Sequence, residues 1–279
     1  MREITAQEIT DAVARMCASA NTMLPDDVRR AFEKAKENET SAAGQEVLRQ
    51  LLENADLAAE TKLPLCQDTG LAVFFVELGA DAHVTGATLT EAINAGVKKG
   101  YEEGYLRKSA CHPLTRANTK DNTPAIIHVD TVPGEHVKIS FMAKGGGSEN
   151  MSRVTMLSPA QGWAGIKDFV VRRVAEAGPN PCPPTIIGLG IGGTFDHAAK
   201  IAKKALLRKL DDTHPDPEVA ALEQELLDAI NDLGIGPMGL GGKTTTLAVK
   251  IAMEPCHLAS LPVAVNVQCH SARHEEVVL

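Results

Sequence analysis

The chain has 279 residues, of which 44% are hydrophobic and 23% charged, a balance typical of a globular protein with a substantial core. Its formal net charge of −8 argues against a nucleic-acid-binding protein, because such proteins take much of their affinity from a basic surface. No apolar run approaches the length that spans a bilayer, and the N-terminus lacks the apolar segment of a signal peptide. The sequence therefore predicts a cytoplasmic protein.

The first sixty residues predict helices. Apolar residues recur at helical spacing over 4–20 and place Cys17 on the apolar face, where a small buried hydrophobe is expected. A second helix is predicted over 25–37, with a proline in its first turn, and a third over 41–60, capped by Ser41. This part forms the expected helical N-terminal segment of the fold.

Strands and helices are mixed in the remainder of the chain. Residues 124–132 and 136–143 are interpreted as two strands joined by a tight turn, and therefore as neighbours in a sheet. The other predicted strands are 71–78, 184–191, 244–253 and 261–268, and the predicted helices are 88–107, 158–178, 195–210 and 216–234. We expect an α/β fold, with mixed sheets flanked by helices, in a single domain over 1–279.

Three of the six cysteines lie in polar or proline-rich loops. Cys66 is followed by Gln67 and Asp68, Cys182 stands between prolines, and Cys269 follows the last predicted strand. Three thiolates from remote parts of a chain suit an iron–sulfur cluster better than a local zinc site. On a four-iron cluster they leave one iron without a protein ligand, able to act as a Lewis acid. Buried structural cysteines are the alternative.

Two further loops carry polar chemistry. The run Gly145–Gly147 can bring backbone N–H groups close to an anion, although a flexible loop is the alternative. Four cations gather between residues 105 and 125, a pattern that suits a carboxylate substrate or else a solvated basic loop; they are Arg107, Lys108, Arg116 and Lys120.

Two glycine-rich motifs resemble nucleotide loops. Gly188, Gly190 and Gly193 spell G-x-G-x-x-G after an apolar run and before a predicted helix, which would indicate a NAD-binding oxidoreductase. The context is unlike a Rossmann domain, because the predicted helix runs into another helix with no strand to end in a ribose-binding acid. The stretch before Lys243 lacks a phosphate-binding loop's first glycine, because that position is Pro237. We do not interpret this second stretch as a nucleotide-binding loop.

Five separated stretches, in order, resemble the alpha subunit of two-subunit class I fumarate hydratases, the iron–sulfur hydro-lyase family that includes L-tartrate dehydratase. They are LPLCQDTG, AKGGGSENMS, CPPTIIGLGIGG, GPMGLGGKTT and LPVAVNVQCHSAR. The resemblance covers roughly residues 5–275. It implies that Cys66, Cys182 and Cys269 hold a [4Fe–4S] cluster, and that the glycines after Cys182 belong to a cluster-binding loop.

The resemblance also implies roles around the substrate. Gln67 would line the site, Arg107 would bind a substrate carboxylate, and the backbone of Gly146 and Gly147 would contact substrate. His257 matches a histidine near the substrate in the family and is expected to be catalytic. Asp68 is the expected catalytic residue for proton relay, and positioning of substrate or cluster is the alternative.

A partner chain is implied as well. In single-chain relatives a second domain supplies further substrate-binding residues, so this chain is expected to need a separate beta subunit, in an assembly of two alpha and two beta chains. The expected reaction interconverts fumarate and L-malate. The alternatives are dehydration of L-tartrate or a related hydroxy acid, a NAD-binding oxidoreductase, and a non-catalytic scaffold that carries a cluster.

Overall fold

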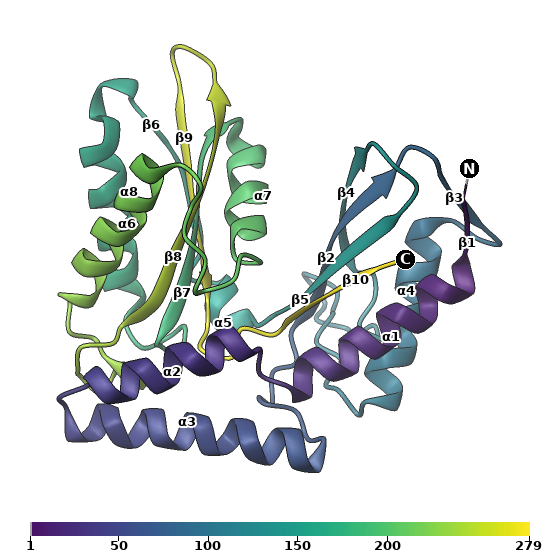
Figure 1. Ribbon diagram of the computed structural model, residues 1–279, viewed down its shortest axis with the longest axis horizontal. Coiled ribbons are helices and arrows are strands. Elements are labelled where there is room, and N and C mark those ends of the chain that lie inside the picture. Colours follow the sequence, from purple (N-terminus) through teal and green to yellow (C-terminus); the bar gives the residue numbers. More distant parts are fainter. Residues whose placement is uncertain (1) are drawn as a thin grey trace. The chain divides into compact units, whose positions relative to one another are not determined.

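The computed structural model describes residues 2–279, which fold into two compact units (Figure 1). Among these residues, the first unit comprises 2–25, 55–146 and 273–279, and the second comprises 26–54 and 147–272. The chain passes between them four times: after residue 25, within helix α3 (Ala42–Thr61), within the short helix α5 (Gly146–Glu149), and after residue 272. The expectation of a single domain over 1–279 stays a prediction.

The first unit is built on a four-stranded sheet in the order β10-β5-β2-β4. Its strands are β2 (Leu71–Gly79), β4 (Ile126–Val132), β5 (Val137–Lys144) and β10 (His274–Val278). Strands β1 (Arg2–Thr5) and β3 (Ala82–Thr85) form a separate parallel pair. The mixed sheet confirms the expected fold class.

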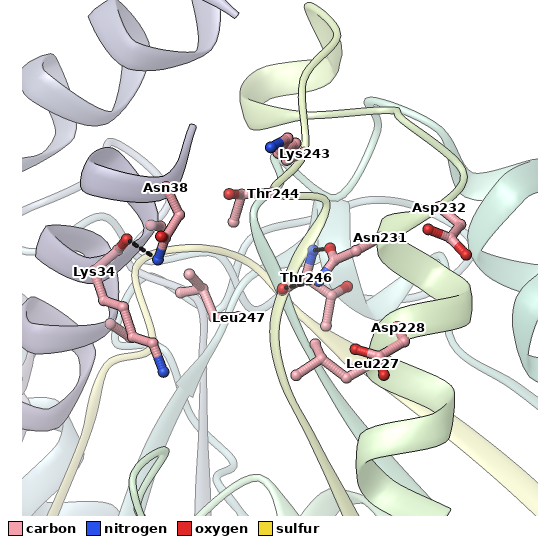
Figure 2. A pocket seen from close by; sticks show the side chains of 12 residues that line it. Lys34, Asn38, Leu227, Asp228, Asn231, Asp232, Lys243, Thr244, Thr246 and Leu247 are labelled. Atoms are coloured by element: carbon pink, nitrogen blue, oxygen red, sulfur yellow. Dashed lines mark hydrogen bonds between the residues drawn. The ribbon is translucent and has the colours of Figure 1, made fainter. Parts of the chain in front are cut away.

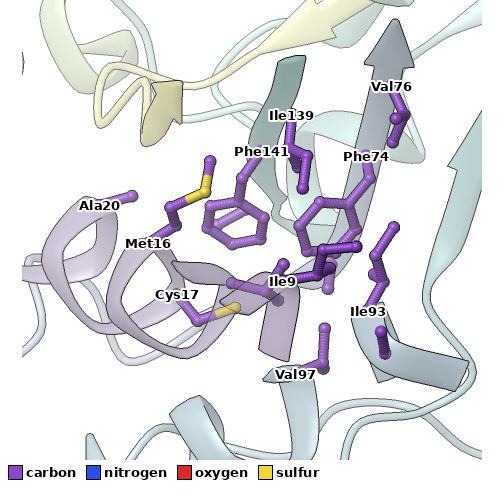
Figure 3. Close-up of a cluster of buried hydrophobic side chains, with 14 of the residues drawn as sticks. Ile9, Met16, Cys17, Ala20, Phe74, Val76, Ile93, Val97, Ile139 and Phe141 are labelled. Atoms are coloured by element: carbon purple, nitrogen blue, oxygen red, sulfur yellow. The ribbon is translucent and has the colours of Figure 1, made fainter. Parts of the chain in front are cut away.

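Helices α1 (Ala6–Thr22) and α4 (Leu89–Glu103) bury their apolar faces in the core of this unit. Each begins at a threonine whose hydroxyl accepts the N–H three residues later, and a glutamate at that position completes the capping box. Figure 3 shows α1 residues Ile9, Met16 and Cys17 packed with Phe74 and Phe141 of the sheet. Cys17 is fully buried, as expected.

The second unit has a four-stranded sheet in the order β6-β9-β7-β8, with helices on both faces. The strands are β6 (Arg153–Leu157), β7 (Thr185–Gly193), β8 (Thr246–Cys256) and β9 (Leu261–Gln268). Figure 1 shows α6 (Gly162–Ala177) and α8 (Pro217–Asn231) on one face and α7 (Phe195–Ala205) on the other. The unit also contains α2 (Asp26–Asn38) and the short helices η1 (Pro159–Gln161) and η2 (Pro237–Gly239).

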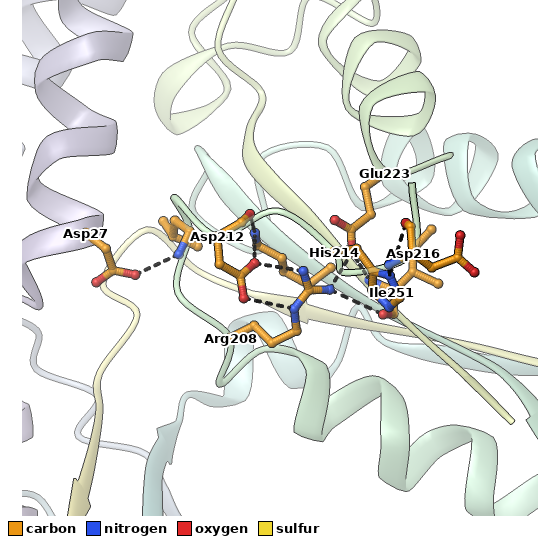
Figure 4. Close-up of polar contacts among 9 residues, drawn as sticks. Asp27, Arg208, Asp212, His214, Asp216, Glu223 and Ile251 are labelled. Atoms are coloured by element: carbon orange, nitrogen blue, oxygen red, sulfur yellow. Dashed lines mark hydrogen bonds and ion pairs between the residues drawn. The ribbon is translucent and has the colours of Figure 1, made fainter. Parts of the chain in front are cut away.

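A polar network ties the segment after α7 to the sheet. The Arg208 guanidinium contacts the carboxylates of Asp212 and Glu223, and Glu223 also accepts the Ile251 N–H at 2.8 Å (Figure 4). The buried Lys250 ammonium donates to Asp212 at 2.8 Å, so each buried charge of the network has an opposite partner.

The predicted pairing of β4 with β5 is wrong, because β2 lies between them. Strand β2 pairs in parallel with β4 and antiparallel with β5, where Phe74 faces Phe141. Its run Val73–Val76 is at most 3% exposed, whereas Ile126 and Val129 on β4 are each 45% exposed. The continuously apolar strand β2 therefore lies inside the sheet, and the more exposed β4 lies at its edge. Strands β8 and β9 likewise flank β7 and do not pair with each other.

The G-x-G-x-x-G glycines lie inside strand β7, not in a loop. A Cβ on Gly188 would stand 2.1 Å from the carbonyl oxygen of Ala202, and one on Gly190 would stand 2.1 Å from that of Ala198. The missing side chains therefore let α7 pack directly on the strand. A dinucleotide fingerprint must end its strand before the phosphate-binding turn, so this geometry opposes the NAD-binding alternative and corrects the expectation of a cluster-binding loop.

Among residues 2–279, no helix combines the length and apolar character required to cross a membrane. The cytoplasmic location stays a prediction.

Candidate functional site

The Cys66 loop lies in the first unit, between α3 and β2, and buried hydrogen bonds hold it on several sides. The N–H of Leu65 donates to the carbonyl of Asn21 at 2.8 Å. The Tyr101 hydroxyl donates to the carbonyls of Thr69 and Gly70 at 2.8 and 3.2 Å, and the buried Asn122 amide also donates to Gly70 at 3.1 Å. The loop is therefore held in one conformation by groups that reach it from the protein interior.

Within this loop Cys66 is partly exposed and its thiol lies 3.3 Å from Oε1 of Gln67. Both carboxylate oxygens of Asp68 accept backbone N–H groups, from Gly70 at 3.0 Å and from Gly146 at 2.8 Å. The Gly146 N–H is thus directed at Asp68 in this structure. These contacts favour the positioning role that the sequence analysis left open for Asp68.

The backbone of Arg107 contacts the Cys66 loop. Its carbonyl accepts the Thr69 hydroxyl at 2.9 Å, while its side chain is exposed. Within residues 2–279, neither Arg107, Lys108 nor Lys120 forms an ion pair. Three cations without carboxylate partners are available to an anionic ligand. The first unit therefore brings together Cys66, Gln67, Asp68, Gly146 and Arg107.

Cys182 and Cys269 lie on adjoining loops of the second unit. Strands β7 and β9 are antiparallel, so the loop before β7 and the loop after β9 meet at one end of the sheet. The backbone N–H and the ring Nδ1 of His270 lie 3.3 and 3.0 Å from the carbonyl oxygen of Cys182. Cys182 adopts a left-handed φ of 54° and holds its thiol in a constrained turn.

His257 lies at the opposite end of this sheet. Strand β8 runs parallel to β7, and its last residue, Cys256, pairs with Gly193. About eight strand residues, or roughly 25 Å, separate that end from the Cys182 loop. His257 lines a groove of about 420 Å³ with Trp163 and the fully exposed Leu258. The unit does not bring His257 together with Cys182 and Cys269, and its catalytic role stays a prediction.

A second groove in this unit, of about 530 Å³, contains none of the predicted site residues. Figure 2 shows Lys34 and Asn38 of α2 on one side, and Asp228 of α8 and its C-cap Asp232 on the other. Lys243, from the glycine-rich stretch that is not interpreted as a nucleotide loop, also lines this groove.

The three loop cysteines suit an iron–sulfur cluster in their chemistry. Each is partly exposed and none is in a disulfide, so its sulfur can reach a ligand as a thiolate. Cys17 differs, because burial raises the pKa of its thiol and keeps it protonated. Within residues 2–279, no three His, Cys, Asp or Glu side chains already converge on one point as metal ligands.

The residues that hold the Cys66 loop from the protein interior were not predicted from the sequence. Arg273 is the clearest case: it is 1% exposed and donates to the carbonyl of Asp68. Its place in the motif after Cys269 was the available signal, but the sequence does not reveal that its side chain turns inward.

Comparison with known proteins connects these loops to a family. The family model described as fumarate hydratase (fumerase) matches residues 10–278. A putative L(+)-tartrate dehydratase subunit alpha from Methanocaldococcus jannaschii is 46% identical over 272 residues, which cover 95% of each chain. The L(+)-tartrate dehydratase subunit alpha of Escherichia coli K12 is 31% identical over 276 residues, covering 98% of this chain and 91% of the relative.

Proposed function

Since the chain belongs to the fumarate hydratase family of iron–sulfur-dependent hydro-lyases, we propose that it is the alpha subunit of an enzyme that interconverts fumarate and L-malate. The observation that carries this proposal is the match to the fumarate hydratase model over residues 10–278. It is supported by the His270 contacts that hold the Cys182 and Cys269 loops together.

Cys66, Cys182 and Cys269 are the proposed ligands of a [4Fe–4S] cluster. When bound through three thiolates, such a cluster supplies an open iron that acts as a Lewis acid toward a hydroxyl and a carboxylate oxygen. Their partial exposure and the backbone restraints on their loops support this assignment.

The chain's own side chains bind and orient the dicarboxylate in this proposal. Arg107 carries the proposed clamp for one carboxylate, because its guanidinium is exposed and has no acidic partner among residues 2–279. Gln67 lies beside the Cys66 thiol, where its amide can contact substrate. Gly146 and Gly147 are the proposed backbone contacts; because the Gly146 N–H donates to Asp68, Gly147 would supply the N–H to substrate.

Removal of a proton next to a carboxylate requires a general base. Both oxygens of Asp68 already accept N–H groups, so we assign it to positioning, and we place the main base on the beta subunit. The relatives are named as subunit alpha, which implies a beta partner, and an assembly of two alpha and two beta chains is proposed.

L(+)-tartrate is the second candidate substrate. The names of the Methanocaldococcus and Escherichia relatives favour it, and the chemistry is the same elimination of water from a hydroxy dicarboxylate. The exposed cations of this chain bind carboxylates and do not distinguish the two substrates.

The test is to assay the anaerobic alpha–beta complex with fumarate, L-malate and L(+)-tartrate. A kcat/KM for malate at least about tenfold above that for tartrate supports the proposal, a difference of about 1.4 kcal/mol in transition-state binding. The reverse preference assigns the chain to tartrate, and turnover of none of the three contradicts both assignments.

A further inference from the structure

Arg273 is the largest side chain among those that are almost fully buried, and it is charged. It follows Cys269 by four residues and begins the last segment of the first unit, before β10. A guanidinium is buried in a protein interior only where hydrogen-bond acceptors surround it. Its acceptors therefore indicate what the residue is for.

One of these acceptors belongs to the Cys66 loop. The Nη1 group of Arg273 donates to the backbone carbonyl of Asp68 and to Oδ1 of Asn21, the latter at 3.2 Å. Asn21 is itself fully buried, and its carbonyl accepts the N–H of Leu65 at 2.8 Å. Asn21 and Arg273 thus hold the loop on both sides of Cys66, at Leu65 and at Asp68.

The other side of Asp68 faces Gly145. A Cβ on Gly145 would stand 3.3 Å from Oδ2 of Asp68 and 3.5 Å from Nη2 of Arg273. Both atoms therefore lie close to the Gly145 backbone, on the side where a side chain would be. The same Oδ2 of Asp68 accepts the N–H of Gly146 at 2.8 Å. A shift of Arg273 would move the Asp68 peptide, and with it both the Cys66 loop and the glycine segment.

We propose that Arg273 is a positioning residue, which fixes the Cys66 loop through the carbonyl of Asp68 and so sets the Cys66 thiol and the Asp68 carboxylate for the reaction. The role of the loop in that reaction rests on the proposed function. The contact itself does not, because it is made inside the first unit by residues of this chain.

The experiment compares Arg273→Met and Arg273→Lys with the wild type, using the full chain co-expressed with its beta partner under anaerobic conditions. Lys250→Met is the matched control, since it removes another buried cation, from strand β8 of the second unit. Amide hydrogen exchange is followed at Leu65, Gly70 and Gly146, whose N–H groups report the two ends of the loop and its glycine contact. Iron and sulfide per chain and separate kcat and KM values are measured on the same samples.

We expect Arg273→Met to exchange these amides about tenfold faster than wild type, with less iron bound, while Lys250→Met leaves them unchanged. Arg273→Lys keeps the charge and is expected to restore part of the protection and to lower kcat more than it raises KM. If Arg273→Met does not fold, Arg273→Lys decides: faster exchange at Gly70 supports the proposal. Wild-type exchange at all three amides in the folded variants would overturn it. A wild-type chain without iron would contradict the proposed function but leave the exchange test valid.

Discussion

Glu39 follows helix α2 with a carboxylate that is almost fully buried, at 2% exposure, and fills a cradle of backbone N–H groups. The N–H groups of Thr40 and Ser41 donate to it at 2.9 and 3.0 Å. Those of Lys243 and Thr244 donate at 2.9 and 3.1 Å. The glycine-rich stretch that resembles a phosphate loop therefore binds a carboxylate of its own chain.

Replacing Glu39 by Gln turns one of the two acceptor oxygens into a donor. Thr40 and Ser41 share Oε1, Thr244 uses Oε2, and Lys243 contacts both, so one or two of the four N–H groups then lose their acceptor. Each unsatisfied buried donor costs about 1–3 kcal/mol. We expect a loss of about 3 kcal/mol in the free energy of unfolding, or a fall in Tm of about 6–12 °C for a unit of this size. Burial raises the pKa of Glu39, but the four backbone hydrogen bonds outweigh it and hold the pKa below the ordinary 4.5.

That direction sets the pH dependence. A carboxyl whose pKa is lower in the folded state stabilises the fold above its unfolded pKa, and this contribution is lost as the pH falls through the folded pKa. The difference in free energy of unfolding between wild type and Glu39→Gln should therefore have its whole value at pH 7 and become smaller below about pH 4.

Urea unfolding of the full chain at pH 7 and below about pH 4 measures this difference in the free energy of unfolding. Glu37→Gln is the matched control, because Glu37 is exposed and lies in the last turn of α2, two residues before Glu39. A Glu39→Gln variant within about 0.5 kcal/mol of wild type at pH 7 would refute the role assigned to the cradle.

Three further predictions concern packing, the Cys66 loop and the buried charges. Gly188→Ala should destabilise the protein by about 2–3 kcal/mol, since its Cβ would overlap the Ala202 carbonyl; an unchanged Tm would contradict the packing role of the glycines. Tyr101→Phe removes the hydroxyl that donates to the loop and should cost about 1 kcal/mol, with faster exchange of the Gly70 amide; unchanged exchange there would argue against this restraint. Glu223→Ala leaves Arg208 without one partner and should cost about 2 kcal/mol in urea unfolding, whereas an effect below about 0.5 kcal/mol would show that water replaces the contact.

The sequence predicted most elements because their signals are local. Periodicity and caps identified the N-terminal helices and α4, and Gly178 ended α6 as expected. Strand order was not predictable in the same way. The turn after β4 indicated a hairpin, but its residues instead pair with the end of β2, where Gly79 and Ala80 donate to His136 and Val132. Burial of the apolar strand β2 on both faces decides the order, and that is a property of the whole sheet.

The candidate site was predictable in its residue types and not in its arrangement. Cysteines, glycines and arginines in loops indicated the chemistry, and the Cys182 and Cys269 loops do adjoin. Their meeting depends on the antiparallel register of β7 and β9, which no local motif encodes. The same register places His257 at the far end, and the inward turn of Arg273 appears only once the core is formed.

The most direct test of the central claim is to co-express the chain with its beta partner, reconstitute the complex anaerobically with iron and sulfide, and follow loss of fumarate together with the visible absorption of the cluster. We expect fumarate turnover and the cluster absorption to appear together, to disappear together in air, and to be lost together when Cys182 is replaced by serine. Full fumarate turnover without iron, or in the Cys182→Ser complex, would contradict it.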